Sequence, residues 1–307
     1  MPIIIINNSP APSIVNRQSS IVNSHRLPSW LRRPMPVNGK TEEVRNIVNS
    51  LRIETICDNA DCPNRGECWD KGHAAVLILG NTCTRNCGFC SVPKGRPKSP
   101  DADEPARIAE MVKRLGLKYL VITSVNRDDL PDGGAGQFRD CIGHIRKQCP
   151  DTRVEILVPD FKDCQETALS VLRQSVPDVF AHNVETVPSL YPAARKGGEY
   201  RISLDLLRLA KERLNVPTKS SIMLGLGETD IEVEQTLKDL RTVRCDRITI
   251  GQYLKPHRDY LDVIEYVTPE KFDFWGRRAA ELGFSHAQSE PFARSSYRAD
   301  GDSHGKG

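Results

Sequence analysis

Residues 74–90 read AAVLILGNTCTRNCGFC, an apolar run that passes directly into a loop with three cysteines. The apolar part is dense in Val, Ile and Leu, as expected for a strand that is buried on both faces of a parallel sheet. Parallel barrels carry their functional residues in the loops at the carboxyl ends of such strands. This stretch therefore predicts a parallel β/α fold with a functional site directly after its first strand.

Similar apolar runs return at regular intervals through the rest of the chain. The predicted strands are 74–80, 118–124, 153–159, 178–184, 219–225 and 247–254. Helical patterns lie between them, near 103–115, 136–148, 163–174, 203–214 and 230–243. This alternation predicts βα units with right-handed crossovers. We expect an α/β fold with a whole or partial parallel barrel, and a doubly wound open sheet is the alternative.

Composition and cysteine usage narrow the class of protein. The net charge of +3 is small for 307 residues and argues against a dedicated nucleic-acid binder. No apolar run approaches the ~20 residues that a membrane span needs. Six of the ten cysteines fall between Cys57 and Cys90. Such a dense group in a long chain predicts metal or redox chemistry in a reducing compartment. The charge and the short apolar runs predict that neither nucleic acid nor a membrane is a partner.

The downstream cysteine loop, residues 81–90, has the pattern Cys-x3-Cys-x2-Cys from Cys83, Cys87 and Cys90. Three closely spaced thiolates can hold three irons of a [4Fe–4S] cube. No fourth cysteine lies nearby, so one iron stays open to another ligand. A structural zinc site would instead need four closed ligands.

The upstream cysteine loop, residues 57–68, has the pattern Cys-x4-Cys-x5-Cys from Cys57, Cys62 and Cys68. It also supplies three thiolates without a fourth nearby. Its Asn, Asp, Pro and Gly residues suit an irregular loop that wraps a cofactor. We expect a second iron–sulfur cluster here, with a zinc knuckle as the alternative.

These motifs resemble those of a known family. Cys-x3-Cys-x2-Cys with Phe89 before its last cysteine is similar to the signature of the radical S-adenosylmethionine (SAM) superfamily. The upstream loop, TSVNRDDLPDGGA at 123–135 and RSSY at 294–297 resemble the lipoyl synthase family. The chain departs from that family at His257 and Tyr260, within QYLKPHRDY, and no role is predicted for either residue.

The resemblance implies a partial (β/α)6 TIM-like barrel with extensions at both ends. The expected segments are a flexible extension (1–41), an extension with the auxiliary cluster loop (42–72), the barrel (73–260), a C-terminal extension that closes on the auxiliary cluster (261–298) and a disordered tail (299–307). Residues 1–41 lack Asp and Glu, so an organelle transit peptide is the alternative for this segment. A cytoplasmic location is expected, with an organelle matrix as the alternative.

The resemblance also implies the cofactors and their ligands. Cys83, Cys87 and Cys90 would bind the [4Fe–4S] cluster that meets SAM, and Phe89, Asn183, Glu185 and Arg195 would contact SAM. Loop capping is the alternative for Asn183 and Glu185, and a surface salt bridge is the alternative for Arg195. Cys57, Cys62, Cys68 and Ser296 would hold the auxiliary [4Fe–4S] cluster, with Ser296 chosen over Ser295. His182 is expected to be a buried structural histidine.

The implied reaction is radical insertion of two sulfur atoms, at carbons six and eight of a protein-bound octanoyl-lysine, with the auxiliary cluster as sulfur donor. The implied partners are lipoyl carrier domains of 2-oxoacid dehydrogenase acyltransferases, the glycine cleavage H protein, a ferredoxin or flavodoxin, and an iron–sulfur carrier protein. Another two-cluster radical enzyme, such as a methylthiotransferase acting on RNA, is the alternative. A small electron-transfer protein fits poorly, since it needs four cysteines for each cluster.

Overall fold

The computed structural model describes residues 27–32, 39–60, 62–71, 73 and 75–299. Most of the predicted N-terminal extension and almost all of the predicted tail lie outside these residues. Among the described residues, no helix combines the length and apolar character of a membrane span.

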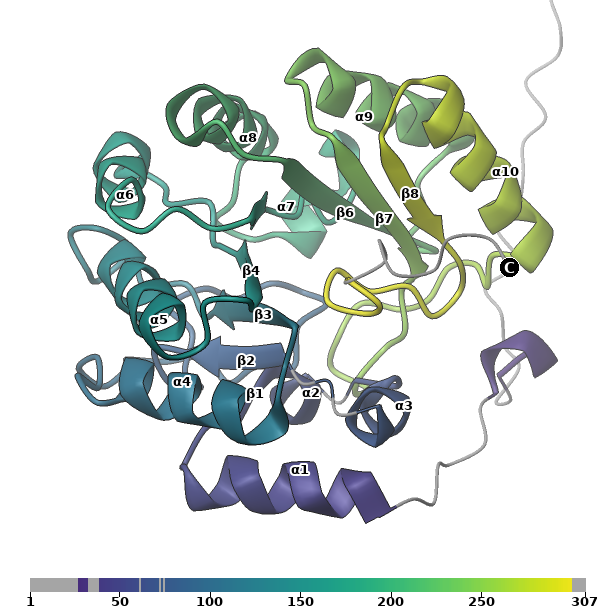
Figure 1. The fold of residues 1–307 in the computed structure, drawn as a ribbon. Coiled ribbons are helices and arrows are strands. Elements are labelled where there is room, and N and C mark those ends of the chain that lie inside the picture. Colours follow the sequence, from purple (N-terminus) through teal and green to yellow (C-terminus); the bar gives the residue numbers. More distant parts are fainter. Residues whose placement is uncertain (1–26, 33–38, 61, 72, 74, 300–307) are drawn as a thin grey trace, which may run out of the picture.

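One curved sheet of eight strands forms the centre of the molecule, and its spatial order β1 to β8 follows the chain order (Figure 1). The strands are β1 (Glu54–Thr55), β2 (Ala75–Ile78), β3 (Tyr119–Ser124), β4 (Arg153–Leu157), β5 (Val179–Ala181), β6 (Thr218–Leu224), β7 (Arg247–Gln252) and β8 (His286–Ser289). Strands β2 to β8 are parallel, and only β1 runs antiparallel to its neighbour. The first and last strands do not pair, so the sheet is an open, partial barrel.

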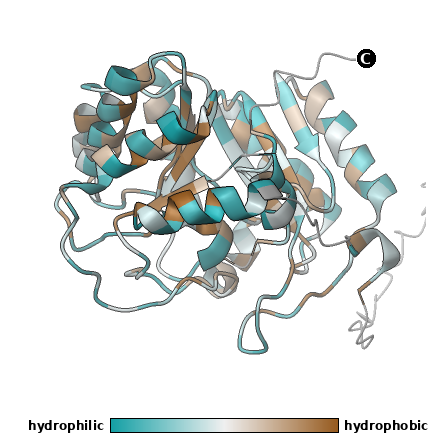
Figure 2. Ribbon diagram, turned by 60° about the horizontal axis from the view of Figure 1, so that its bottom comes forward, coloured by the Kyte–Doolittle hydropathy of each residue, from teal (hydrophilic) through white to brown (hydrophobic). Residues whose placement is uncertain are grey.

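Helices cover the outer face of this sheet. The described helices are η1 (Ser29–Leu31), α1 (Gly39–Ser50), α2 (Ile56–Asn59), α3 (Arg65–Asp70), α4 (Glu104–Leu115), α5 (Ala135–Gln148), α6 (Gln165–Leu172), η2 (Pro188–Leu190), α7 (Tyr191–Ala194), α8 (Tyr200–Leu214), α9 (Asp230–Thr242) and α10 (Pro269–Glu281). Figure 2 shows brown strands inside and helices that turn teal residues outward. Burial of the apolar helix faces against the strands therefore holds the two layers together.

Local sequence signals set the ends of these helices. Helix α9 starts with a capping box, in which the Thr229 side chain accepts from the Glu232 backbone and the Glu232 side chain accepts from the Thr229 backbone. Helix α4 ends at Gly116, whose φ of 60° is left-handed. The first cap fixes the loop at the carboxyl end of β6, and the second fixes the short connection into the amino end of β3.

The predicted fold class is confirmed: all six predicted strands and the five helices between them are present. The sequence prediction missed β1, β8 and α10. Strand β8 consists of His-Ala-Gln-Ser and carries no run of apolar residues, yet it pairs in parallel with β7. Because β8 follows α10, it adds one more βα repeat within the segment predicted as the C-terminal extension.

The C-terminal end of the described chain meets the upstream cysteine loop beside β2 and β3. In Figure 1 the yellow segment after β8 curves back toward α3, which belongs to the upstream cysteine loop. We call residues 290–298 the C-terminal turn. It passes so close to β7 that a Cβ atom on Gly251 would lie 2.1 Å from the Ala293 carbonyl oxygen. Glycine at 251 is therefore needed for the turn to reach the sheet.

Candidate active site

The downstream cysteine loop is fixed by backbone hydrogen bonds to several parts of the barrel. The Gly88 N–H donates to the Ala194 carbonyl (2.8 Å), and the Leu261 N–H donates to the Gly88 carbonyl (3.0 Å). A Cβ atom on Gly88 would lie 2.7 Å from the Ala193 carbonyl oxygen. The Thr84 N–H donates to the Asn126 carbonyl. The loop is thus held between α7, the segment at Leu261 and the end of β3.

The thiols of this loop lie in a shared, shielded environment. Burial raises the pKa of Cys87 to about 12, Arg195 opposes the shift, and Cys90 and Glu185 add to it. Burial raises the pKa of Cys90 to about 11, with contributions from Cys83 and Glu185. Cys87 and Cys90 are therefore protonated before a metal binds, and metal binding must displace their protons. Glu185 and Arg195 are therefore within electrostatic range of Cys87.

Asn183 and Glu185 lie just beyond β5, beside β6. The Glu185 backbone pairs with Ser221 and Met223 of β6 while its φ is 68°. A left-handed conformation is costly for a residue other than glycine and often marks a functional position. Burial raises the pKa of the Glu185 carboxyl, although Arg195 and Asn183 favour its charged form. The Asn183 side chain also contacts the C-terminal turn, because its Oδ1 accepts a hydrogen bond from Ser295 Oγ (2.8 Å).

Arg195 is only 8% exposed, so the alternative of a surface salt bridge is wrong. One terminal nitrogen of its guanidinium, Nη1, donates to the Asn183 carbonyl (2.7 Å), the Ser203 hydroxyl (2.9 Å) and the Tyr191 hydroxyl (3.3 Å). Its other terminal nitrogen lies 3.2 Å from His182 Nε2. These contacts with the protein leave the guanidinium well oriented, and contact with a SAM carboxylate stays a prediction.

His182 is buried, as predicted. Burial and the nearby Arg195 lower its pKa to about 3, so the imidazole is neutral at physiological pH. Its Nδ1 lies 2.8 Å from the Val158 carbonyl and must carry the proton, which leaves Nε2 to accept from Arg195. The histidine thus helps to orient the guanidinium.

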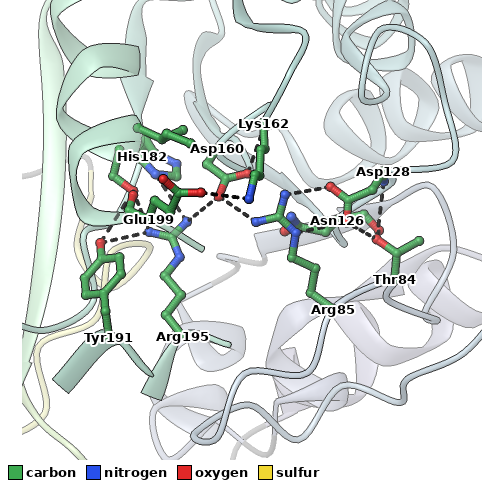
Figure 3. Close-up of polar contacts among 12 residues, drawn as sticks. Thr84, Arg85, Asn126, Asp128, Asp160, Lys162, His182, Tyr191, Arg195 and Glu199 are labelled. Carbon is green, nitrogen blue, oxygen red and sulfur yellow. Dashed lines mark hydrogen bonds and ion pairs between the residues drawn. The ribbon is translucent and has the colours of Figure 1, made fainter. Parts of the chain in front are cut away.

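A buried carboxylate joins Arg195 to the downstream cysteine loop (Figure 3). Arg85 lies between Cys83 and Cys87 in the sequence. Asp160 Oδ2 lies 2.6 Å from the Arg85 guanidinium and 3.9 Å from the Arg195 guanidinium. Arg85 also pairs with Asp128 at 2.6 Å. Burial opposes ionisation of Asp160, but the charges of Arg195 and Arg85 hold its pKa below the ordinary value. A cavity of about 490 Å³ opens beside Arg85 at the ends of β3 and β4.

The upstream cysteines share a second pocket with a residue from the far end of the chain. The residues that line it are Cys57, Cys62, Asn64, Cys68, His73, Ala75, Tyr119, Val121, Ser296, Tyr297 and Ala299. Burial raises the pKa of Cys68 to about 12, and the nearby Cys57 and Cys62 raise it further. The structure therefore brings together all four residues predicted for the auxiliary cluster. Ser295 does not line this pocket.

Side chains of the upstream cysteine loop hold the C-terminal turn against this pocket. Asn64 Nδ2 donates to the Phe292 carbonyl (2.7 Å), and the Tyr297 hydroxyl donates to both carboxylate oxygens of Glu67 (3.0 and 2.8 Å). Although burial opposes it, hydrogen bonds from Lys71, Tyr297 and Arg298 lower the pKa of Glu67 to about 2. Residues more than 200 positions apart thus close one site.

The donor set of each cysteine loop fits an iron–sulfur cluster. Within the described part of the chain, no three His, Cys, Asp or Glu side chains gather tightly enough to hold a single metal ion. A [4Fe–4S] cube instead spreads its thiolates over different irons. The downstream loop offers three thiols, and the upstream pocket offers three thiols and the Ser296 hydroxyl.

Sequence reasoning missed three residues that organise these pockets: Asp160, Glu155 and Lys219. All three are buried. Glu155 and Lys219 are charged residues inside apolar strand patterns, RVEIL and TKSSIML. A buried charge is costly unless it is paired. A charged residue inside an apolar strand pattern was therefore the signal that could have identified them.

Comparisons with known proteins agree with this arrangement. The model of the radical SAM superfamily matches residues 77–240. A lipoyl synthase from Nitrosococcus oceani is 50% identical over 276 residues, which cover 90% of this chain and 85% of the relative. A lipoyl synthase from Neisseria meningitidis serogroup C is likewise 50% identical over 276 residues, with the same coverage of both chains. The chain belongs to the lipoyl synthase family.

Membership of this family settles the activity and the cofactors. The chain is a radical SAM enzyme with lipoyl synthase activity, and it uses SAM and two [4Fe–4S] clusters. Its substrates are octanoylated carriers. The alternative of a methylthiotransferase acting on RNA is therefore set aside.

Solved structures agree with the fold. A methylornithine synthase superposes with a TM-score of 0.51 at 13% identity, covering 82% of this chain and 79% of that enzyme. Streptococcus suis SuiB, bound to its precursor peptide SuiA, superposes with a TM-score of 0.52 at 11% identity, covering 69% of this chain and 48% of SuiB. At these identities the likeness concerns the fold alone.

Proposed function

We propose that the two cysteine loops divide the lipoyl synthase reaction between them. In this proposal Cys83, Cys87 and Cys90 hold the cluster that meets SAM, whereas Cys57, Cys62, Cys68 and Ser296 hold the auxiliary cluster. When bound, the first cluster and SAM supply radical chemistry, and the auxiliary cluster supplies the sulfur for carbons six and eight of the octanoyl chain. The observation that carries the proposal is the pocket that Ser296 shares with the three upstream cysteines.

The choice of Ser296 has a chemical reason. A hydroxyl oxygen is a harder donor than a thiolate and matches an iron–sulfur centre less well. It also gives up its proton far less readily than a cysteine thiol. A serine is therefore a weaker fourth ligand, as suits an iron that must leave when sulfur is transferred.

The residues around the downstream cysteine loop would bind and orient SAM. Glu185 presents a carboxylate next to the cysteines, and Asn183 hydrogen-bonds to it. The charge of Arg195 favours the ionised form of Glu185, and contacts with His182 and Ser203 fix the direction of the guanidinium. Phe89 is half-buried between Gly88 and Cys90 and offers an apolar surface to the cofactor.

The proposal also includes the specific proteins that deliver the substrate, the electrons and the iron–sulfur cluster. We infer that the octanoyl group arrives on carrier domains of 2-oxoacid dehydrogenase acyltransferases or on the glycine cleavage H protein. A ferredoxin or flavodoxin would deliver electrons, and an iron–sulfur carrier protein would restore the auxiliary cluster. A cytoplasmic location suits the chain, because all ten cysteines are free thiols, as in a reducing compartment.

A direct experiment tests this assignment. The chain is reconstituted anaerobically and incubated with SAM, dithionite and an octanoylated lipoyl-domain peptide, and the peptide is weighed by mass spectrometry. Two cubes require about eight irons and eight sulfides per chain, and the expected product carries two added sulfur atoms. Zinc in place of iron and sulfide, or a peptide of unchanged mass, would contradict the proposal.

A further inference from the structure

The barrel interior contains a charged pair that none of the roles above uses. Lys219 of β6 and Glu155 of β4 are 5% and 0% exposed, and Lys219 Nζ lies 2.9 Å from Glu155 Oε1. The Tyr119 hydroxyl of β3 donates to the other carboxylate oxygen of Glu155 (2.5 Å). An interior ion pair is often no more stabilising than apolar residues of similar volume. Its presence here therefore calls for a specific role.

The third partner of Lys219 indicates that role. Lys219 Nζ donates to the carbonyl oxygen of Ser295 at 2.6 Å, so the ammonium group joins the barrel wall to the C-terminal turn. Hydrogen bonds from charged donors are stronger than neutral ones. The same serine donates through its hydroxyl to Asn183 Oδ1 at 2.8 Å. Both the backbone and the side chain of Ser295 are thus held by barrel residues.

This anchoring decides which serine faces the upstream cysteines. Ser295 is committed to Asn183 and Lys219 and is only 8% exposed. Ser296, the next residue, lines the pocket with Cys57, Cys62 and Cys68. Tyr119 lines the same pocket while it orients Glu155, so the ion pair lies directly behind the proposed cluster.

We propose that Lys219 and Ser295 are positioning residues that hold Ser296 at the auxiliary cluster and link this position to the SAM-binding Asn183. Glu155 and Tyr119 fix the direction of Lys219. The proposal rests on the proposed function, because it takes Ser296 as the fourth ligand. Its consequence is that the fourth iron is retained only while the C-terminal turn is anchored to the barrel interior.

The test measures how fast iron leaves the auxiliary cluster. In a background with Cys83, Cys87 and Cys90 changed to Ala, only this cluster can load, and a ferrous chelator reports release of its first iron. The double variant Lys219→Met with Glu155→Leu removes the pair without leaving a lone buried charge. We expect about tenfold faster release, as fits the loss of a charge-assisted hydrogen bond, and a smaller increase for Ser295→Ala.

Two further measurements separate positioning from general destabilisation. Amide hydrogen exchange of residues 293–298 in the metal-free chain should accelerate in the double variant. Lys211→Met breaks another ion pair, with Asp246 at 2.7 Å, between α8 and the residue before β7. It should lower the melting temperature and leave iron release and exchange of the turn unchanged.

The outcomes distinguish this proposal from the one on which it rests. If Ser296→Ala accelerates iron release but the double variant and Ser295→Ala do not, the positioning role is overturned and the ligand assignment stands. If Ser296→Ala also releases iron at the parent rate, the ligand assignment itself is wrong. Should the double variant fail to fold, Ser295→Ala alone decides, because parental iron release and exchange in that variant would refute the proposal.

Discussion

The two cysteine loops contain three thiols each but are supported in different ways. The downstream loop is held by backbone hydrogen bonds from α7, the end of β3 and the segment at Leu261. The upstream loop closes its pocket through side chains that reach the C-terminal turn, from Asn64 to Phe292 and from Tyr297 to Glu67. The first site is a property of the barrel, whereas the second forms only when the C-terminal turn has packed against the upstream cysteine loop.

This difference teaches that one site can change while the other persists. Besides its backbone contacts, the downstream loop is held by Arg85, which pairs with Asp160 and Asp128, so its position depends on the barrel and not on the C-terminal turn. The upstream pocket depends on a few side chains and on Ser296, which the C-terminal turn supplies. The two sites should therefore respond separately to substitution.

The largest effect should follow loss of a downstream cysteine. Cys83→Ala, Cys87→Ala or Cys90→Ala each removes one of three ligands, and we expect deoxyadenosine formation from SAM to fall more than ~100-fold, beyond the usual cost of losing an outer-shell partner. Cys149→Ala is the control, because this half-buried thiol lies outside both pockets. Deoxyadenosine production near the parent rate in all three variants would refute the loop assignment.

The upstream cysteines should separate the two chemical steps. Cys57→Ala, Cys62→Ala and Cys68→Ala are expected to abolish the sulfur-containing product while deoxyadenosine forms at a rate within about threefold of the parent, as expected for independent sites. Both products are measured in the same anaerobic reaction by mass spectrometry. Unchanged lipoyl product in these variants would show that the auxiliary pocket does not supply the sulfur.

A smaller effect is expected at the serine pair. Ser296→Cys should keep the auxiliary cluster but slow sulfur insertion by about tenfold, because a thiolate binds iron–sulfur centres better and lets the iron go less readily. Ser295→Ala should be milder, since it removes only the hydrogen bond to Asn183. Iron content and the rate of product formation are the two measurements. Faster insertion in Ser296→Cys would contradict the reason given for a serine ligand.

The sequence predicted the parts of this comparison that are local. Three cysteines within ten residues, after an apolar strand, identify the downstream site without any knowledge of the fold. The contact of Ser296 with the upstream pocket joins residues more than 200 positions apart and came only from resemblance to a family. Lys219 and Glu155, which we propose support it, lie on β6 and β4 with β5 between them, and the curvature of the sheet brings their side chains together.

Strand β8 was missed for a related reason. Its four residues are half-buried and carry no apolar pattern, so pairing with β7 and packing against α10 determine its conformation. Arg195 shows the opposite case, since its residue type suggested a charge contact but only the fold shows how fully the protein encloses it. Tertiary context thus decided the elements and contacts that local pattern could not.

The finest test of the comparison uses two tyrosine hydroxyls, one behind each site. Tyr297 donates to Glu67 beside the upstream loop, and Tyr253 donates to the Leu261 carbonyl (2.8 Å), on the segment that holds Gly88. Replacing either with Phe should cost about 1–2 kcal/mol, the usual range for such hydrogen bonds. Melting temperatures should therefore fall by similar small amounts.

The reactions of the two variants should differ. Tyr297→Phe should slow sulfur insertion severalfold and spare deoxyadenosine formation, because only the C-terminal turn is loosened. Tyr253→Phe lowers both products in proportion, because insertion depends on the radical made at the downstream loop. If both variants reduced the two products in the same ratio, the two sites would not be supported independently.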